Sequence, residues 1–173
     1  YEYDNEGWLL STTDGNGNTI RMEYTENGGQ QCVSCGEGGK GASPSAIIYP
    51  SFRKEFKYDA RGRKIEEKDI LGAGLENEYV TTFGYDPAGN LSWVRDKEGK
   101  LTSYEYDELN RLEKVIDQEG NETKYNYDVR GNLRFLTDGK NQTTEFRFDR
   151  ANRLVKEIRP MGQEVSYQYD AAG

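Results

Sequence analysis

Few residues in this sequence have the types and spacing of a reaction centre. Cys32 and Cys35 form the one CxxC pair, a spacing shared by local disulfides, zinc sites and thiol redox centres. Trp8 and Trp93 carry flat aromatic faces of the kind that stack on sugar rings. Aspartates recur at regular intervals, but the chain contains no His, so it lacks the commonest metal ligand and general base.

The CxxC pair alone does not define a cofactor site. A structural zinc site needs four ligands, and the chain has neither a second Cys pair nor a His. A thioredoxin-like centre needs a helix after a strand, which the glycines from Gly36 to Gly41 oppose. A c-type haem motif needs His where Gly36 stands. A disulfide is favoured if the protein is exported, whereas free thiols and a metal shared with another segment remain open, and no cofactor is predicted.

Composition excludes several classes of partner and favours a thin sheet. The 31 acidic and 23 basic residues give a net charge of -8, without the Lys and Arg cluster that nucleic-acid binding requires. No stretch approaches the roughly 18 apolar residues of a membrane span. Hydrophobic residues make up only 34% of the chain, yet aromatic residues reach 12%, unlike disordered segments. This combination favours a two-faced sheet over a domain with a thick core.

An aromatic–x–aromatic–Asp motif repeats along the chain and decides the fold prediction. Its copies end at Asp4, Asp59, Asp86, Asp107, Asp128, Asp149 and Asp170. From Asp86 onward the spacing is 21 residues, and a degenerate copy, Met22-Glu-Tyr24-Thr25, lies 21 residues after Asp4. Two insertions separate the early copies, so the chain contains eight repeats.

Each repeat predicts two turns with the sequence Asp-x-x-Gly or Asp-x-x-Asn. Turns of the first kind follow the aromatic pair, at Asp86 with Gly89, Asp107 with Asn110, Asp128 with Gly131 and Asp149 with Asn152. Turns of the second kind start ten residues later, for example at Asp14 with Gly17, Asp69 with Gly72, Asp96 with Gly99 and Asp117 with Gly120. Asp favours the start of a type I turn, and Gly or Asn tolerates the left-handed residue that closes it. We predict a structural role for these residues and positive φ at Gly89, Gly99, Asn110, Gly120, Gly131, Asn141, Asn152 and Gly162.

Short runs rich in Tyr, Phe, Val, Thr and Ile separate the turns and predict strands. Because side chains alternate between the two faces of a strand, both aromatics of each motif lie on one face. In-register repeats should then stack tyrosine on tyrosine across neighbouring hairpins. No window shows a sustained helical period, so we predict antiparallel strands through most of 80–170 and almost no helix.

The repeats divide the chain into three segments. Residues 1–27 contain two repeats, the second degenerate, and residues 52–173 contain the others. Residues 28–51 interrupt the pattern, are rich in Gly, Ser and Pro, and include the CxxC pair. They predict a loop followed by a short apolar strand. The second insertion, near 73–78, predicts a longer hairpin connection.

The repeated pattern resembles the YD-repeat family, also called Rhs repeats, whose unit reads roughly Y-x-Y-D-x-x-G-x-L-x-x-x-x-D-x-x-G. The family's Leu position is occupied by Leu9, Leu91, Leu112, Leu133 and Leu154. Lys64 departs from the pattern, with Ile65 beside it. The resemblance implies an all-β fold, an antiparallel strip of 21-residue β-hairpin repeats that curls as part of a hollow β-shell. Family members are large secreted or cell-surface proteins, and many bacterial ones enclose a C-terminal toxin domain.

A structural segment of such a shell wall is therefore the leading functional prediction. Its partners would be further repeats of the parent chain, other copies of itself, or an enclosed toxin domain, because an unfinished strip leaves edge strands with unpaired backbone groups. The alternatives are a glycan-binding or cell-surface adhesion module, with Trp8 and Trp93 as contacts, and a self-associating extracellular β assembly. An enzyme is not predicted, since the sequence has no nucleophile elbow, P-loop or dinucleotide motif.

Overall fold

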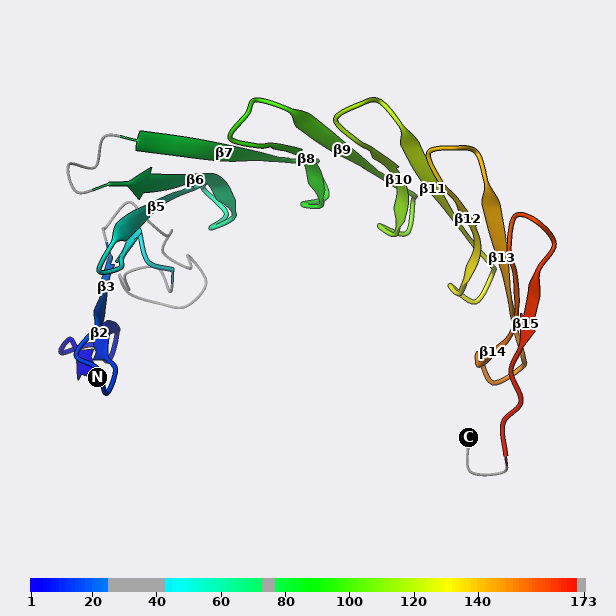
Figure 1. Cartoon of the computed structure of the whole chain (residues 1–173), viewed down its shortest axis with the longest axis horizontal. Helices are drawn as coiled ribbons and strands as arrows, with labels where there is room; N and C mark the ends of the chain where they lie inside the picture. Colours follow the sequence, from blue (N-terminus) through cyan, green and yellow to red (C-terminus); the bar gives the residue numbers. More distant parts are fainter. Residues whose placement is uncertain (25–42, 73–76, 171–173) are drawn as a thin grey trace. The chain divides into compact units, whose positions relative to one another are not determined.

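The computed structural model describes residues 1–24, 43–72 and 77–170, which form an all-β chain with no helix in these ranges (Figure 1). The strands are β1 (Glu2–Tyr3), β2 (Leu9–Thr13), β3 (Thr19–Glu23), β4 (Ala46–Ile48), β5 (Phe52–Tyr58), β6 (Lys64–Leu71), β7 (Asn77–Tyr85), β8 (Leu91–Arg95), β9 (Leu101–Tyr106), β10 (Leu112–Ile116), β11 (Glu122–Tyr127), β12 (Leu133–Thr137), β13 (Thr143–Phe148), β14 (Leu154–Ile158) and β15 (Glu164–Ser166). They follow one another in sequence order in a single sheet. The predicted antiparallel hairpin array is confirmed.

The chain divides into two compact units, and each is described by itself. One unit comprises Tyr1–Gly84 with Val94–Lys100, and the other comprises Tyr85–Trp93 with Leu101–Gly173. The second unit contains most of the regular repeats, and the first contains both insertions.

In the regular repeats, the aromatic strand of each hairpin pairs with a strand that begins with Leu. Tyr104 of β9 lies opposite Val115 of β10, and Tyr106 lies opposite Leu112. The register shifts between Leu112 and Lys114, because a bulge inserts one extra residue there. Equivalent shifts occur in the β11–β12 and β13–β14 pairs. The bulge keeps the aromatic and aliphatic side chains on one face, which we call the aromatic face.

This register corrects the expected stacking of tyrosine on tyrosine. The strands opposite the tyrosines are aliphatic, with Tyr125 facing Leu136 and Tyr127 facing Leu133. Aromatic strands of successive repeats are therefore two strands apart, roughly 9.6 Å at ordinary strand spacing. That distance is too great for direct stacking of ring on ring.

The sheet has almost no core. Among the described residues only Ala46 (2% exposed) and Ile70 (6%) are buried hydrophobics, and Ser11 (5%) is the buried polar residue. Most strand residues are half-buried on one face or the other. The protein therefore depends on backbone ladders, turns and contacts along the faces of the sheet rather than on a packed interior.

In the first unit, the strand expected at the end of the 28–51 insertion is present. Strand β4 lies between β3 and β5, pairing Met22 with Ile47 and Ile47 with Lys54. The preceding loop lies outside the described residues, as do Cys32 and Cys35. The segment boundaries at 27 and 51 stay a prediction.

The predicted turn at Asp69 and Gly72 is wrong. Asp69 lies inside β6, opposite Lys54 on one side and Tyr79 on the other. Its carboxylate is 2.9 Å from the Lys54 ammonium instead of accepting turn N–H groups. The ladder therefore continues to Leu71, and the connection to β7 is displaced into the second insertion.

Candidate functional site

The turns are the structural elements that recur most strictly. In the turn that starts at Asp107, the Leu109 and Arg111 amides donate to Oδ1 of Asp107 at 2.9 and 3.0 Å. The Asn110 amide donates to the Asp107 carbonyl, and the Asp107 amide donates to the Arg111 carbonyl, both at 2.9 Å. The same four bonds recur at Asp4, Asp14, Asp59, Asp96, Asp117, Asp128, Asp138 and Asp149. Each Asp therefore satisfies backbone donors that the strands leave unpaired.

The residue that closes each turn is left-handed, as predicted. φ is positive at Gly89, Gly99, Asn110, Gly120, Gly131, Asn141, Asn152 and Gly162. The turn that starts at Arg159 has no carboxylate, yet its backbone bonds are unchanged, with Gly162 N to Arg159 O at 2.8 Å. Pro160 occupies its second position, where a φ near −65° is required. Backbone conformation alone is thus sufficient to form the turn.

The electrostatics of the turn aspartates suit hydrogen-bond acceptors and not acid–base catalysts. The Arg111 side chain holds the pKa of Asp107 below its usual value, and Asn90 does the same for Asp86. Both aspartates are half-buried, and the lowered pKa of each keeps its carboxylate anionic at neutral pH. Paired carboxylates for acid–base chemistry need a shielded site that raises one pKa. In the described ranges, no three His, Cys, Asp or Glu side chains group as metal ligands.

Contacts between successive repeats, which the sequence did not reveal, follow two patterns. In what we call the long clasp, the residue after the turn covers the aromatic ring of the next repeat. The Arg111 guanidinium lies 4.5 Å from the Tyr127 ring centroid, and the Tyr127 hydroxyl donates to the Leu112 carbonyl at 2.8 Å. The same arrangement recurs at Arg153, Tyr169 and Leu154 and, with a ring in place of the guanidinium, at Trp8, Tyr24 and Leu9.

In the second pattern, the short clasp, an asparagine takes the place of the arginine. Nδ2 of Asn90 donates to Asp86 Oδ2 of its own turn at 3.0 Å and to Asn110 Oδ1 of the next turn at 2.9 Å. Asn132 repeats this geometry with Asp128 and Asn152, both at 3.0 Å. Each clasp ties one first-kind turn to the following repeat.

An ion network replaces apolar residues in the hairpin of β5 and β6. The Lys54 ammonium is 2.6 Å from Glu67 Oε1, and the Lys64 ammonium contacts Glu67 Oε2. Lys64 also lies 4.8 Å from the Phe83 ring centroid and 5.7 Å from that of Phe56. Burial raises the pKa of Glu67, but hydrogen bonds from Lys54 and Lys64 outweigh it and leave the pKa below its usual value. The network is charge-paired within the protein and contains no free base.

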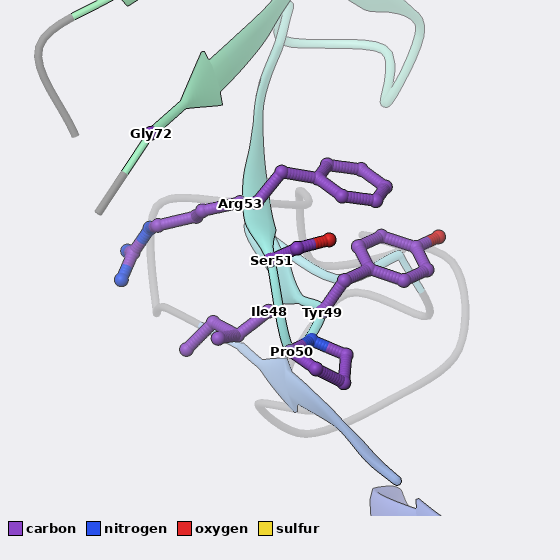
Figure 2. A pocket seen from close by; sticks show the side chains of 7 residues that line it. Ile48, Tyr49, Pro50, Ser51, Arg53 and Gly72 are labelled. Carbon is purple, nitrogen blue, oxygen red and sulfur yellow. The ribbon is translucent and has the colours of Figure 1, made fainter.

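The hairpin between β4 and β5 borders a shallow hollow of 490 Å³ lined by Ile48, Tyr49, Pro50, Ser51, Phe52, Arg53 and Gly72 (Figure 2). The Tyr49 and Phe52 rings stack at a centroid distance of 4.2 Å and an angle of 8°. Figure 2 shows the Arg53 side chain directed away from the Tyr49 ring. Glu23 and Glu55 already pair with the Arg53 guanidinium at 2.8 and 2.9 Å. The hollow therefore offers stacked rings without convergent polar groups, and no ligand is assigned to it.

Comparison with known proteins identifies the family of this repeated unit. The Teneurin YD-shell family matches residues 43–173, which is more than half of the chain. The chain belongs to the teneurin YD-shell family. A search of curated proteins finds no match.

Solved structures share the fold of this YD-shell chain at low sequence identity. The crystal structure of TcdB2-TccC3 without its hypervariable C-terminal region has a TM-score of 0.66 and 16% identity, covering 98% of this chain and 11% of that chain. The Photorhabdus luminescens Tc holotoxin pore with a mutated TccC3 has a TM-score of 0.63 and 16% identity, covering 96% of this chain and 10% of that chain. This YD-shell chain thus spans about a tenth of the solved chains that it matches.

The roles predicted for the remaining site residues of the YD-shell chain stay predictions. Trp8 packs against Tyr24 with ring centroids 5.6 Å apart, and Trp93 lies half-buried in β8. A glycan role for either ring is untested by these contacts. A disulfide between Cys32 and Cys35 also stays a prediction. The described residues contain no helix long and apolar enough to cross a membrane.

Proposed function

We propose that this chain is a stretch of wall in a hollow β-shell, and that the shell belongs to a large secreted or surface protein and encloses a toxin domain of the same parent. The observation that carries the proposal is a fifteen-stranded sheet with almost no core. Open sheets of more than about ten strands usually curl or split, and a curled single layer suits a wall. Membership of the YD-shell family and the fold shared with TcdB2-TccC3 support this function. The proposed role involves no chemical step.

Protection of the enclosed polypeptide tests the wall function. A site for a sequence-specific protease would be inserted in the full-length parent within the turn at 138–141, whose residues are exposed or half-buried. The enclosed domain should resist a non-specific protease until the wall is cut, and then be degraded at the rate of the isolated domain. The matched control is the same protein without the inserted site. Equal degradation before and after cutting would contradict enclosure.

We also propose that further repeats, or another copy of the chain, extend the sheet. Strand β15 is the last strand of the sheet and pairs with β14 through Lys156, Glu157 and Ile158. The backbone N–H and C=O groups of an edge strand are a template on which a further strand can pair. Light scattering on the chain tests this proposal. Mass that rises with concentration is the expected result, whereas a monomer over a wide concentration range contradicts it.

A further inference from the structure

The two clasps differ in how far one side chain reaches toward the next turn. We call the residue after each left-handed position the exit residue, and the left-handed residue 20 positions later the landing residue. In the short clasp, the side chain of the exit residue Asn90 is too short to reach the backbone of the next turn. Its Nδ2 instead donates to the side-chain Oδ1 of the landing residue Asn110 at 2.9 Å. The combined reach of two short amides joins the turns.

The long clasp spans the same interval with one side chain. Nε of Arg111 donates to Asp107 Oδ2 at 2.7 Å, and its guanidinium extends over the Tyr127 ring. A Cβ atom added at the landing residue Gly131 would lie 3.9 Å from Nη1 of Arg111. The guanidinium therefore already occupies the space beside the landing residue. An Asn there would have to place its amide in that space.

The sequence pairs exit and landing residues by the same logic in the first-kind turns of the regular repeats. The described pairs are Asn90 with Asn110, Arg111 with Gly131 and Asn132 with Asn152, and the sequence also carries a Gly 20 residues after Arg153. Gly and Asn both tolerate the left-handed conformation, so the backbone alone does not dictate which of them appears. The exit residue is the feature that distinguishes the two cases.

Second-kind turns show the same order of residue types in the sequence, although no side-chain hydrogen bond joins Asn121 to Asn141 among the described residues. Their pairs are Lys100 with Gly120, Asn121 with Asn141, and Gln142 with Gly162. A Cβ atom added at Gly139 would lie 2.7 Å from the Cβ of Asn121, so the exit residue Asn121 also lies against the following turn. A long exit residue thus accompanies Gly, and Asn accompanies Asn, along both edges of the array.

The residue type at a third position of the repeat, inside the strand that follows the exit residue, alternates together with the type of clasp. Two residues after the family Leu, the strands carry Trp93, Lys114, Phe135 and Lys156 in turn. Aromatics follow Asn exit residues, and lysines follow Arg exit residues. The side chains therefore repeat every 42 residues, although the backbone repeats every 21.

We propose that the exit residue is a specificity determinant that selects the repeat able to pack against it, and that the building unit of this array is a pair of repeats. In the first-kind turns, an Asn exit residue accepts a repeat whose left-handed residue is Asn, and an Arg exit residue accepts one with Gly. A mismatched pair either leaves the Asn amide without its acceptor or crowds the guanidinium. This rule rests on the fold of the array and is independent of what the wall encloses.

The test exchanges one clasp for the other in the whole chain and measures local opening at residues 149–154 by hydrogen exchange. Asn152→Gly keeps a residue that suits φ = +61° but removes the acceptor, so opening should rise about fivefold, as for one lost hydrogen bond. Asn132→Arg should also raise opening, because the guanidinium meets Asn152. The double variant rebuilds a long clasp and should return to within about twofold of the parent, since neighbouring residues couple.

Two further variants keep the result interpretable. Asn141→Gly is the matched control, because Asn141 is left-handed at φ = +60° and has no side-chain hydrogen bond among the contacts of the described residues. It should leave opening at 149–154 unchanged. The reciprocal pair Arg111→Asn with Gly131→Asn should rebuild a short clasp between the turns at 107 and 128. Opening in either double variant that equals the product of the two single effects would overturn the selection rule.

Discussion

The β9–β10 hairpin and the β5–β6 hairpin share a backbone but differ in what fills the aromatic face. Relative to the turn Asp, the positions of Thr102, Leu112 and Val115 in the regular hairpin are those of Lys54, Lys64 and Glu67 in the other. The cross-strand register is the same, since Tyr104 lies opposite Val115 and Phe56 lies opposite Glu67.

The comparison shows that turns, and not side-chain packing, define this hairpin. Burying isolated charges in a thick core would be prohibitive, but the single-layer face leaves Lys54 27% and Glu67 22% exposed. Charges are tolerated there if each has a partner. The hairpin next to the large insertion thus keeps the family backbone while changing the chemistry of its surface.

The largest expected effect comes from removing the central carboxylate of the ion network. Glu67→Ala would remove the Glu67 partner from both Lys64 and Lys54, so we expect a loss of about 2 kcal/mol in the free energy of unfolding. Urea denaturation measures it. The matched variant Val115→Ala removes only half-buried methyl groups and should cost about 1 kcal/mol.

Replacing the whole network sharpens the same comparison. The quadruple variant Lys54→Thr, Lys64→Leu, Glu67→Val and Asp69→Asn gives the β5–β6 hairpin the apolar set of its regular counterpart and leaves no carboxylate without its Lys54 partner. Because exchanging a complete ion network for uncharged residues is often neutral or stabilising, the quadruple variant should be at least as stable as the parent. A quadruple variant less stable than Glu67→Ala would mean that the two hairpins are not equivalent.

Substitutions of left-handed turn glycines should lower stability equally in the regular repeats and in the insertion-bearing region. Gly62 and Gly120 have φ of +75° and +84°, and a Cβ atom at either would meet nothing within 4 Å. Alanine at either position should therefore cost about 1–2 kcal/mol from backbone strain alone, measured by urea denaturation. Gly15→Ala, in open space without positive φ, is the control and should change stability by less than about 0.5 kcal/mol.

Tyrosine hydroxyls should contribute less to stability than the turn glycines. They bond different partners in the regular repeats and in the insertion-bearing region. Tyr127 donates to the Leu112 carbonyl at 2.8 Å, whereas Tyr58 donates to the Pro44 carbonyl at 3.0 Å. Phenylalanine at either position should cost about 1 kcal/mol. Hydrogen exchange should place the loss at β10 for Tyr127→Phe and at residues 43–46 for Tyr58→Phe. Equal loss of protection in both places for one variant would contradict these local roles.

Sequence periodicity could predict the backbone but not the contacts between repeats. The spacing of Asp and of Gly or Asn requires particular turn dihedrals, so hairpins and left-handed residues followed directly from residue types. The partners of Tyr127 and Asn90 depend on register and bulges, which place side chains 16 to 20 residues apart in contact. The turn expected at Asp69 failed for a related reason, because its carboxylate pairs with Lys54 across the sheet.

The smallest effect is expected when the protein is placed in acid. It best separates the contribution of the Asp carboxylates from that of the backbone hydrogen bonds in the turns. The pKa of Asp107 is lowered by the Arg111 hydrogen bond, and that of Asp59 by Arg63. A carboxylate with a lowered pKa in the folded state adds stability above its unfolded pKa, and that stability is lost as pH falls through the folded pKa. Protection of both turns should therefore decrease as pH falls below 3.8, the ordinary pKa of an aspartate, in the regular and the insertion-bearing regions alike. The turn at Arg159 is closed by backbone bonds from Gly162 and to Gln163 at 2.8 Å, so its protection factors should stay constant over the same range. Loss of protection at Arg159 in that window would show that acid acts on the sheet as a whole and not on the turn carboxylates.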